Sequence, residues 1–368
     1  MKVGLTFDVK VPDGLSSDPS SRRSLVDDDL AGRSRPRGLS ACSTEPDDLH
    51  EEFDSPQTIQ AIGDAIASHG HQVSFIGDGR DAVLALLGDP PDLVFNIAEG
   101  EGVSRSREAR IPALLEILGI PYTGSDPLTL TLTLDKVRTK ILVAAADVPT
   151  PRHAVIETGA EREQDEILEK LRFPLFVKPA YEGSSKGIRE NCLITDPADL
   201  AARAMGMLDG YRQPLLVEEF IDGRELTVGL IGNDPPRVIG IMEIQPRIRT
   251  GPFIYGVEVK RNWENLIDLV TPAPLHPTQR ALVEAMALKA WDAVGGRDVG
   301  RMDFRLKDGI PYFLEVNPLP GLSPISGDLV ILARGMGIDY RTLVGMILEC
   351  ASSRVFPAQL ESAVAGGS

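Results

Sequence analysis

Hydrophobic and polar positions alternate from Arg301 to Asn317, within the stretch RMDFRLKDGIPYFLEVNPLPGLSPIS that runs on to Ser326. Successive side chains on a strand point to opposite faces, so two alternating runs around Lys307-Asp308-Gly309 predict a hairpin with one buried and one polar face. The buried face is expected to hold Met302, Phe304, Leu306, Ile310, Tyr312, Leu314 and Val316. The other face is expected to hold Arg301, Asp303, Arg305, Phe313, Glu315 and Asn317.

The loop of this hairpin decides which residues face one another. A two-residue Asp-Gly loop would mix the two faces, whereas a three-residue loop with Gly309 in the left-handed conformation pairs Phe304 with Tyr312 and keeps the apolar residues together. We therefore expect the three-residue loop, with Asp303 opposite Phe313. That register also gathers four polar residues on one side, namely Arg301, Asp303, Glu315 and Asn317. Their carboxylate and amide oxygens suit Mg²⁺, and a half-exposed hairpin with ordinary surface charges is the alternative.

The first part of the chain repeats a strand and helix pattern. Strands are expected at 1–10, 72–76 and 92–97, and helices from Pro56 to Gly70 and at 81–87. Ser55 precedes a proline at the first helical position, which is a helix start signal. This order indicates a small parallel sheet, with Asn96 at the edge where such sheets place ligands. Residues 12–50 are rich in Ser, Asp, Arg, Pro and Gly, so we expect a mobile insertion, with a lid or partner-binding loop as the alternative.

The middle of the chain carries a candidate phosphate site. An apolar strand from Phe173 carries Lys178 and leads into a loop that contains Gly183, Ser184, Ser185 and Gly187. Backbone N–H groups of such a loop can approach phosphate oxygens, and Lys178 adds a positive charge. The loop does not match GxxxxGK[ST], so it is not a P-loop, and a simple Gly/Ser turn is the alternative.

Further elements follow from the same kind of pattern. Helices are expected at 108–118, 128–146, 277–294 and 338–351, and strands at 215–221, 224–231 and 236–245. Asp222-Gly223 is expected to turn the chain, so that the strand from Arg224 returns antiparallel, with Glu225 near its start. The tail from Phe356 is small and polar, and we expect it to be frayed.

Composition narrows the class of protein. The 368 residues are 42% hydrophobic and carry a net charge of −16, which disfavours non-specific binding to nucleic acid. No run approaches the roughly 20 apolar residues of a membrane span, and the N-terminus lacks a signal-peptide core. The three cysteines, Cys42, Cys192 and Cys350, lack metal-binding spacing. A cytoplasmic protein with neither membrane nor nucleic-acid partners is therefore expected.

Four stretches, in this order, resemble the ATP-grasp ligases, and most closely the D-alanine–D-alanine ligase family. They are LGIPYTGSDPLTLTLTLDK, FPLFVKPAYEGSSKGI, LLVEEFIDGRELTVG and the hairpin stretch, within residues 92–351. The resemblance implies an N-terminal α/β domain followed by two α+β halves that hold ATP between them, and it makes a homodimer a candidate assembly. The expected segments are the α/β domain at 1–126, a central ATP-grasp subdomain at 127–212, a C-terminal subdomain with the metal and substrate site at 213–352, and a flexible tail at 353–368.

The resemblance also implies roles for individual residues. ATP is expected to contact Lys136, Lys178, Glu182, Gly183, Ser184, Ser185, Glu218, Glu219, Phe220, Ile221, Glu225 and Lys260. Two Mg²⁺ ions, or Mn²⁺ in their place, are expected on Asp303, Glu315 and Asn317. Catalytic roles are expected for Ser184, Lys260, Arg301 and Gly321, the last two stabilising an oxyanion. Substrate contacts are expected from Ser326, which would hold a carboxylate, Glu52, which would hold an amino group, Asn96 and Gly327.

The implied reaction has two steps. A carboxylate attacks the γ-phosphate of ATP to give an acyl phosphate and ADP, and an amine then attacks the acyl carbon and releases phosphate. The first-substrate region departs from the family, because Asn96–Gly102 and Ser104–Glu108 replace its His-Gly and Gly-Glu-Asp-Gly segments, and Arg261 replaces the tyrosine after the phosphate lysine. D-alanine is therefore the default substrate, with other amino acids or small carboxylates as the alternative. A catalytically silent nucleotide-binding regulator is the alternative of another class, and the missing GxGxxG fingerprint argues against a nicotinamide oxidoreductase.

Overall fold

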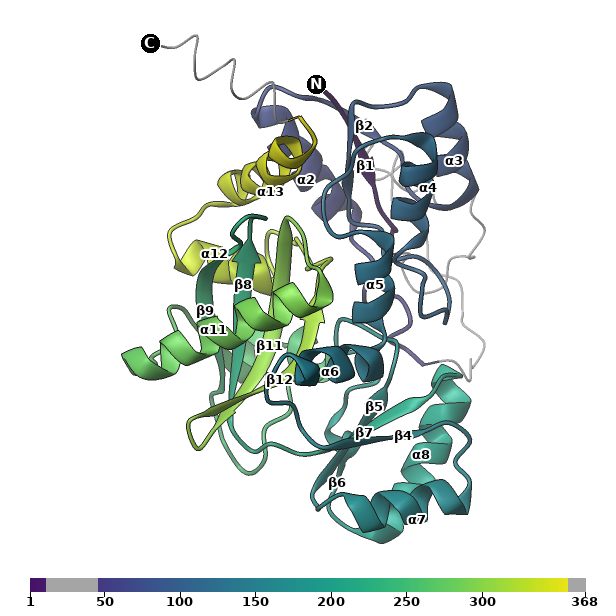
Figure 1. The fold of residues 1–368 in the computed structure, drawn as a ribbon, viewed down its shortest axis with the longest axis vertical. Coiled ribbons are helices and arrows are strands. Elements are labelled where there is room, and N and C mark those ends of the chain that lie inside the picture. The colour runs from purple at the N-terminus through teal and green to yellow at the C-terminus, as the bar shows by residue number, and fades with distance from the viewer. Residues whose placement is uncertain (11–45, 357–368) are drawn as a thin grey trace.

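The computed structural model describes residues 1–10 and 46–356, which form three sheets packed with helices (Figure 1). Most of the insertion expected at 12–50, and most of the tail expected at 353–368, lie outside the described residues. The described end of the insertion, 46–50, is a turn in which Asp48 is fully buried. Among the described residues, no helix has both the length and the apolar composition needed to cross a bilayer.

The N-terminal unit contains a parallel sheet, as predicted. Its strands are β1 (Lys2–Thr6), β2 (Gln72–Phe75) and β3 (Leu93–Asn96), in the order β2-β1-β3. Its helices are α2 (Pro56–Ser68), α3 (Gly79–Gly88) and α4 (Arg110–Leu118). Ser55 caps α2 because its Oγ accepts the N–H of Thr58 at 3.1 Å, so the predicted helix start is confirmed.

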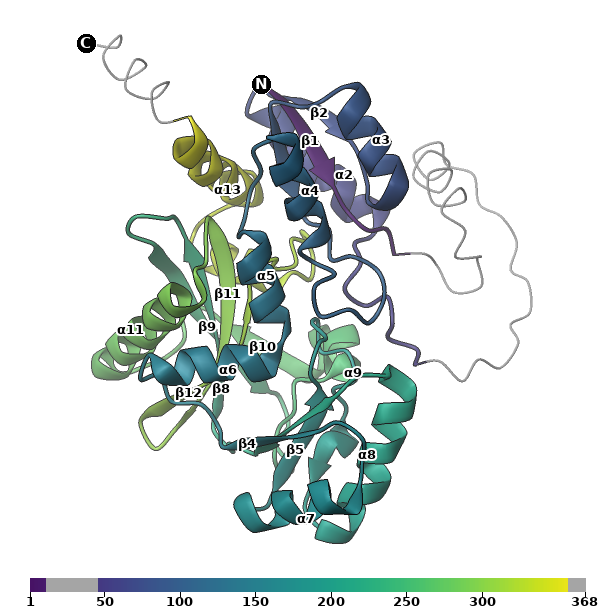
Figure 2. The same ribbon diagram turned by 45° about the vertical axis from the view of Figure 1, so that its right-hand side comes forward.

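A four-stranded antiparallel sheet lies at the end of the molecule opposite the N-terminal unit (Figure 2). Its strands, in spatial order, are β4 (His153–Ile156), β7 (Leu215–Glu219), β5 (Leu175–Pro179) and β6 (Leu193–Ile194), and its helices are α7 (Glu161–Lys170) and α8 (Pro197–Tyr211). The expected antiparallel return after β7 is wrong, because the next strand, β8 (Arg224–Ile231), belongs to a different sheet. The chain crosses over because Leu215 and Val217 are buried in the core of this sheet, whereas Leu226 and Val228 are buried in the core of the next.

The third sheet has five antiparallel strands in the order β10-β9-β8-β11-β12. Besides β8, they are β9 (Arg237–Pro246), β10 (Ile267–Val270), β11 (Val299–Lys307) and β12 (Ile310–Asn317). Helix α11 (Pro277–Val294), whose predicted bounds are confirmed, packs on this sheet. The single helix expected at 128–146 is instead two helices, α5 (Pro127–Leu134) and α6 (Lys136–Ala145). Asp135 separates them, because its backbone is extended and its side chain caps α6 by accepting the N–H of Arg138 at 3.1 Å.

The turn between β11 and β12 differs from the one expected. It has two residues, Asp308 and Gly309, which both adopt positive φ angles of 52° and 81°. Phe304 therefore faces Phe313 rather than Tyr312. Two consecutive residues in this conformation match the right-handed twist of the flanking strands, which favours the shorter loop. The expected three-residue loop is wrong.

The extra residue of β12 is taken up in the strand. Leu314 is skipped in the pairing, so that Asp303 faces Glu315 across a bulge. The bulge changes which residues lie on each face of the hairpin. Side chains before and after the extra residue alternate in opposite registers. Met302, Phe304, Leu306 and Val316 are buried as expected, Phe313 joins them, Ile310 is exposed, and Leu314 lines a pocket.

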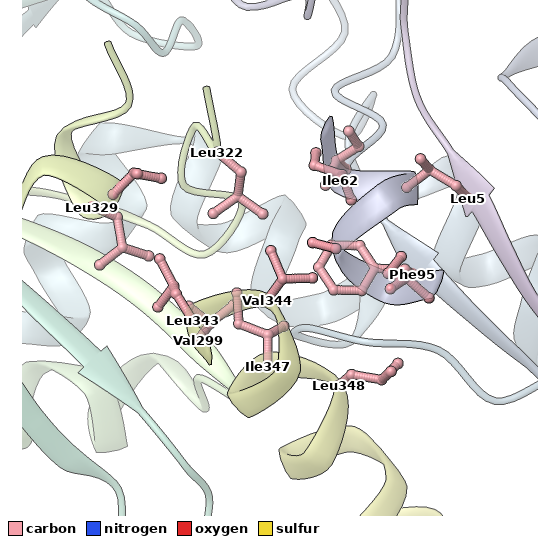
Figure 3. Packing of buried hydrophobic residues seen from close by; sticks show 14 of the residues in the cluster. Leu5, Ile62, Phe95, Val299, Leu322, Leu329, Leu343, Val344, Ile347 and Leu348 are labelled. Carbon is pink, nitrogen blue, oxygen red and sulfur yellow. The ribbon is translucent and has the colours of Figure 1, made fainter. Parts of the chain in front are cut away.

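The C-terminal helices join the N-terminal unit to the third sheet. They are α12 (Asp328–Gly335) and α13 (Tyr340–Val355), and the last helix was predicted. In Figure 3, Phe95 and Ile62 of the N-terminal unit lie in one hydrophobic cluster with Val344 and Ile347 of α13. This cluster fixes the end of β3 relative to β11. Short helices complete the described fold at α9 (Val257–Arg261), α10 (Trp263–Leu266) and Glu190–Cys192.

Candidate active site

A pocket of about 660 Å³ lies between the four-stranded and five-stranded sheets and collects most of the predicted nucleotide residues. It is lined by Lys178, Ser185, Glu218, Glu219, Phe220, Ile221, Glu225 and Lys260, and also by Asp303 and Glu315. A neighbouring cavity is lined by Lys136, Glu182, Gly183, Ser184, Arg301, Asn317 and Gly321. Residues that lie as far apart in the sequence as Lys136 and Gly321 thus meet in one region.

The two lysines expected to contact phosphate are buried and paired with carboxylates. Lys178 Nζ lies 2.8 Å from Glu218 Oε2, and Lys136 Nζ lies 3.4 Å from Glu315 Oε2. Lys140, which the sequence did not single out, also forms an ion pair with Glu218. Burial alone would raise the pKa of Glu218, but Lys140 and Lys178 lower it to about 2. Three buried lysines, Lys136, Lys140 and Lys178, are therefore paired with the two carboxylates of Glu218 and Glu315.

Arg305 holds the residue that was expected to accept ribose hydroxyls. One of its amino groups donates to Glu225 Oε2 at 2.6 Å, and the other donates to the carbonyl of Ile221 at 3.0 Å. Its guanidinium lies 4.6 Å from the centre of the Phe220 ring. Alternation placed Arg305 on the polar face of the hairpin, but its partners lie on β8 and in the segment between β7 and β8, which alternation does not locate.

The predicted metal ligands lie side by side on β11 and β12. Asp303 faces Glu315 and Arg301 faces Asn317 in the strand ladder, so the expected gathering of these four residues is confirmed. Arg301 Nη2 donates to Asp303 Oδ2 at 2.9 Å and lies 3.7 Å from Glu315 Oε1. Burial raises the pKa of Asp303 to about 6. Burial alone would also raise the pKa of Glu315, but the neighbouring lysines and Arg301 hold it well below its usual range.

The oxygens of this patch fit a hard divalent cation. Asp303 and Glu315 supply carboxylates and Asn317 an amide, and the Asn317 Nδ2 is buried without a hydrogen-bond partner in the described part of the chain. Within residues 1–10 and 46–356, no group of three His, Cys, Asp or Glu side chains is placed to hold a metal by itself. Mg²⁺ commonly shares its ligands with substrate phosphates, so this set suits an ion that arrives with a nucleotide.

The glycine loop, residues 182–187, is tied to the segment that precedes α2. The N–H of Gly183 donates to Glu52 Oε1, and the N–H of Gly187 donates to Asp48 Oδ2 at 2.9 Å. Two serines between them adopt left-handed backbone conformations, with φ of 47° and 61°. The backbone N–H groups that were expected to bind phosphate therefore face anions, and two of them, those of Gly183 and Gly187, donate to carboxylates.

Glu52, which was expected to hold a substrate amino group, lies in a buried cluster of charges. Both of its oxygens lie 2.8 Å from Arg107 Nη2, and Oε2 lies 2.9 Å from Lys186 Nζ. Glu182 contacts the same two cations and accepts from Gln213 Nε2 at 2.6 Å. Arg107 and Lys186 were visible in the sequence as part of SRSRE and GSSKG, but no sequence signal linked them to Glu52. Both oxygens of Glu52 are therefore already in contact with a cation.

A second cavity, of about 500 Å³, collects two of the four predicted substrate residues, Glu52 and Asn96. It is lined by Glu52, Asn96, Ser184 and Gly321, by the carboxyls of Asp54 and Glu99, and by the apolar side chains of Phe95, Ile97, Val299, Leu319, Leu322 and Ile347. Ser326 does not line it. Ser326 is exposed, and its Oγ lies 3.0 Å from Ser323 Oγ. The N–H of Gly327 donates to the carbonyl of Ser323, which places Gly327 at the start of α12.

Known proteins resemble this chain in both sequence and structure. The family model described as D-ala D-ala ligase C-terminus matches residues 142–349. The D-alanine--D-alanine ligase of Desulforudis audaxviator is 31% identical over 295 residues, which cover 80% of this chain and 92% of that protein. The chain belongs to the D-alanine–D-alanine ligase family. The predicted membership is therefore confirmed, and the chain is an ATP-dependent ligase of the class that forms carbon–nitrogen bonds.

Two other relatives are similar to this chain over most of its length. The D-alanine--D-alanine ligase of Dechloromonas aromatica is 37% identical over 252 residues, covering 67% of this chain and 77% of that protein. The uncharacterized protein y4sG of Sinorhizobium fredii is 35% identical over 303 residues, covering 79% of this chain and 86% of that protein.

Solved structures confirm the predicted fold class. The D-alanine--D-alanine ligase of Bacillus anthracis, complexed with ATP, aligns with a TM-score of 0.68 at 21% identity, covering 95% of this chain and 97% of that one. The VanG D-Ala:D-Ser ligase of Enterococcus faecalis aligns with a TM-score of 0.67 at 19% identity, covering 95% and 99%. The chain therefore has the α/β and α+β fold of ATP-grasp ligases.

Proposed function

We propose that this ligase joins a carboxylate donor to an amine through an acyl phosphate, with D-alanine as the first donor to test. The observation that carries the proposal is that Lys136 and Arg301, which line the neighbouring cavity, contact Glu315, and Arg301 also contacts Asp303, while both carboxylates line the first pocket together with Lys178. The family relatives are named D-alanine--D-alanine ligase, which supports a small amino acid as donor.

In the first step, a donor carboxylate must approach the γ-phosphate of ATP against strong charge repulsion. Lys136 and Lys178 would offset the charge of the polyphosphate, and Lys260, whose Nζ lies 5.0 Å from the centre of the Tyr255 ring at the pocket wall, would meet the terminal phosphate. Their contribution is positioning and electrostatic stabilisation, because the lysines are held in place before the reaction begins.

The remaining nucleotide contacts are assigned by position in the same pocket. Backbone groups of Glu218 to Ile221 would contact the edge of the base, and Glu225, oriented by Arg305, would accept hydrogen bonds from the ribose. Residues 182–185 of the glycine loop would fold over the phosphates. Such a cover would also protect an acyl phosphate from water.

Asp303, Glu315 and Asn317 would hold two Mg²⁺ ions, or Mn²⁺, because their oxygens fit a hard cation and lie side by side on β11 and β12. Bound ions would offset phosphate charge and act as a Lewis acid toward the phosphoryl oxygens.

In the second step, an amine attacks the acyl carbon, and a negative charge develops on the carbonyl oxygen. Arg301 and the backbone N–H of Gly321 line the same cavity and would stabilise that oxyanion. Removal of one such donor typically costs roughly 3–4 kcal/mol of transition-state stabilisation. The carboxylate donor is expected in the second cavity, which Asn96, Ser184 and Gly321 line.

Other amino acids or small carboxylates form a second candidate class of donor. Glu52 is engaged by Arg107 and Lys186, so it is not available to hold the amino group of D-alanine in this arrangement. The carboxyl groups of Asp54 and Glu99, which line the second cavity, are alternative partners for the amino group of a donor amino acid.

Purified protein with ATP, Mg²⁺ and a panel of D- and L-amino acids tests the proposal. Phosphate release and product mass are measured together. The expected result is one phosphate released for each amide formed, with D-alanine among the active donors. Activity on other acids without D-alanine would select the second class of donor. Nucleotide binding without turnover on the whole panel would contradict the proposal and favour a regulatory protein.

A further inference from the structure

Asp328 is a buried carboxylate beside the reaction centre, and the sequence did not single it out. Ser326, which was expected to hold a substrate carboxylate, is exposed, and its Oγ lies 3.0 Å from Ser323 Oγ. Two positions later, Asp328 is the first residue of α12, with a side chain that is 7% exposed. The first turn of a helix favours a negative charge, because its N–H groups have no partners within the helix.

Both oxygens of Asp328 contact residues that line the first pocket or its neighbouring cavity. Its Oδ2 accepts from Arg301 Nη1 at 2.8 Å, and its Oδ1 accepts from the hydroxyl of Tyr255 at 3.0 Å. Lys260 Nζ lies 3.8 Å from the same Oδ2. The carbonyl of Tyr255 in turn accepts from Ser185 Oγ, in the glycine loop, at 3.1 Å. Asp328 therefore joins Arg301 to the segment that carries Tyr255 and Lys260.

Arg301 is held by a carboxylate at each of its two amino groups. Nη1 donates to Asp328 at 2.8 Å, and Nη2 donates to Asp303 at 2.9 Å. Because the guanidinium is planar and rigid, contacts at both ends fix its position and the directions of its remaining N–H groups. Nε is buried and has no hydrogen-bond partner among the described residues, and Arg301 lines the same cavity as Gly321. The arginine therefore keeps donor capacity while its orientation is already set.

We propose that Asp328 is a positioning residue, which fixes the Arg301 guanidinium so that its remaining N–H groups face the oxyanion of the second step. The inference rests on the ligase reaction proposed above. In that step the amine nitrogen bonds to the acyl carbon and loses a proton, negative charge collects on the carbonyl oxygen, and phosphate leaves with the electron pair of the broken C–O bond. Asp328 acts only through Arg301, because protein donors occupy both of its oxygens.

Asp303 alone would hold Arg301 less firmly during the reaction. Asp303 and Glu315 are assigned to metal ions, so their negative charge would be shared between those ions and Arg301 once a nucleotide is bound. Asp328 is not part of that set and keeps its charge for Arg301 and Lys260. Donors that are oriented beforehand stabilise a transition state best, because they need not reorganise as the charge develops. Loss of Asp328 should therefore slow the second step much more than the first.

The variant Asp328→Ala removes both contacts, and the ratio of ADP formed to amide formed reports the effect. Wild-type protein, with a donor and acceptor pair on which it is active, is expected to form one ADP for each amide. In the variant, acyl phosphate that the amine does not consume is lost to water. We expect at least a threefold higher ratio of ADP to amide and a kcat for amide formation that is lower by at least tenfold. Removal of an oxyanion donor itself costs more, about 100- to 1,000-fold in kcat.

A purely structural role would remove active molecules and leave the ratio of ADP to amide at one. Asp268→Ala is the matched control, because Asp268 pairs with Arg247 at 2.9 Å on the surface, and its ratio is expected to stay at one. Calorimetry of ADP binding with Mg²⁺ checks the nucleotide pocket without turnover, and Asp328→Ala is expected to bind ADP within threefold of wild type. A ratio of one in a folded Asp328→Ala protein, or a loss of ADP affinity as large as the loss of kcat, would overturn the proposal.

The wild-type protein separates failure of the ligase reaction from failure of this proposal. Absence of amide from every donor and acceptor would remove the reaction, and the role of Asp328 with it, whereas wild-type amide with an unchanged ratio in the variant would remove only that role. If Asp328→Ala does not fold, a crystal structure of wild type with ADP, Mg²⁺ and a phosphorylated phosphinate decides, because the tetrahedral phosphorus stands for the acyl carbon. The proposal predicts Arg301 in contact with both Asp328 and the phosphinate oxygen, and contact with only one of them would overturn it.

Discussion

The variant Glu52→Gln tests the buried charge cluster that anchors the glycine loop. In the native protein, Glu52 faces Arg107 at 2.8 Å and Lys186 at 2.9 Å, and it accepts the N–H of Gly183. Burial alone would raise the pKa of Glu52, but Arg107 and Lys186 hold it well below its usual range. A carboxylate with a lowered pKa stabilises the fold above its unfolded pKa, so the whole contribution is present at pH 7.

The expected cost follows from what the substitution leaves behind. Breaking a buried ion pair by removing one partner typically costs about 3–5 kcal/mol, because the other charge stays buried without compensation. The glutamine oxygen can still accept one hydrogen bond, and Glu182 still contacts both Arg107 and Lys186. We therefore expect a loss of about 3 kcal/mol in the free energy of unfolding, at the lower end of that range. We also expect a higher KM for ATP, because the N–H of Gly183 then faces a neutral amide instead of a carboxylate.

Urea unfolding at pH 7, followed by tryptophan fluorescence, measures the loss of stability. Glu51→Gln is the matched control, because the neighbouring Glu51 contacts Lys10 at 3.2 Å and Arg261 at 3.0 Å but is more exposed. Exposed ion pairs of this kind are worth about 0–1 kcal/mol, so the control is expected to lose little. A Glu52→Gln protein that is as stable as the Glu51→Gln protein would refute the reasoning.

Three further predictions concern other parts of the site. Glu315→Gln is expected to abolish ligation while leaving thermal stability within a few degrees of wild type, and full activity at ordinary Mg²⁺ would contradict the metal assignment. The pKa of Glu218 is lowered to about 2, so its contribution to the free energy of unfolding should disappear as the pH falls from about 4.5 toward 2. In urea titrations, the difference in stability between wild type and Glu218→Gln should shrink by about 1.4 kcal/mol per pH unit over that range, and a constant difference would refute this. A Cβ on Gly100 would lie 2.6 Å from the carbonyl of Arg107, and Gly102 has open space; Gly100→Ala should therefore lower the melting temperature clearly more than Gly102→Ala, and an equal effect would show that Gly100 is not needed at this contact.

Local patterns predicted the fold wherever one face of an element is buried. The isoleucines of α2 and the cap at Ser55 are signals within a single helix, and α11 has a proline at its start and a glycine at its end. The alternation of hydrophobic and polar residues in β11 and β12 likewise predicted that Asp303 and Glu315 share one face. The turn was not predictable from parity alone, because a two-residue loop with a bulge at Leu314 brings the same polar residues together as a three-residue loop would.

The missed residues are charged side chains whose partners lie far along the chain. Arg107 and Glu52 are 55 positions apart, and Arg305 and Glu225 are 80 positions apart. Periodicity describes the surroundings of a residue within its own element, so it cannot match a charge with a partner on another element. Asp328 was missed for a related reason, because only the turn after Ser323 determines whether Ser326 or Asp328 reaches Arg301.

A crystal structure of the protein with ADP, Mg²⁺ and a phosphorylated donor analogue tests the central claim most directly. The account predicts the polyphosphate between Lys136 and Lys178 on one side and Asp303 and Glu315 on the other, with metal density touching the two carboxylates. A nucleotide bound elsewhere, or phosphates that leave these four residues without contact, would contradict it.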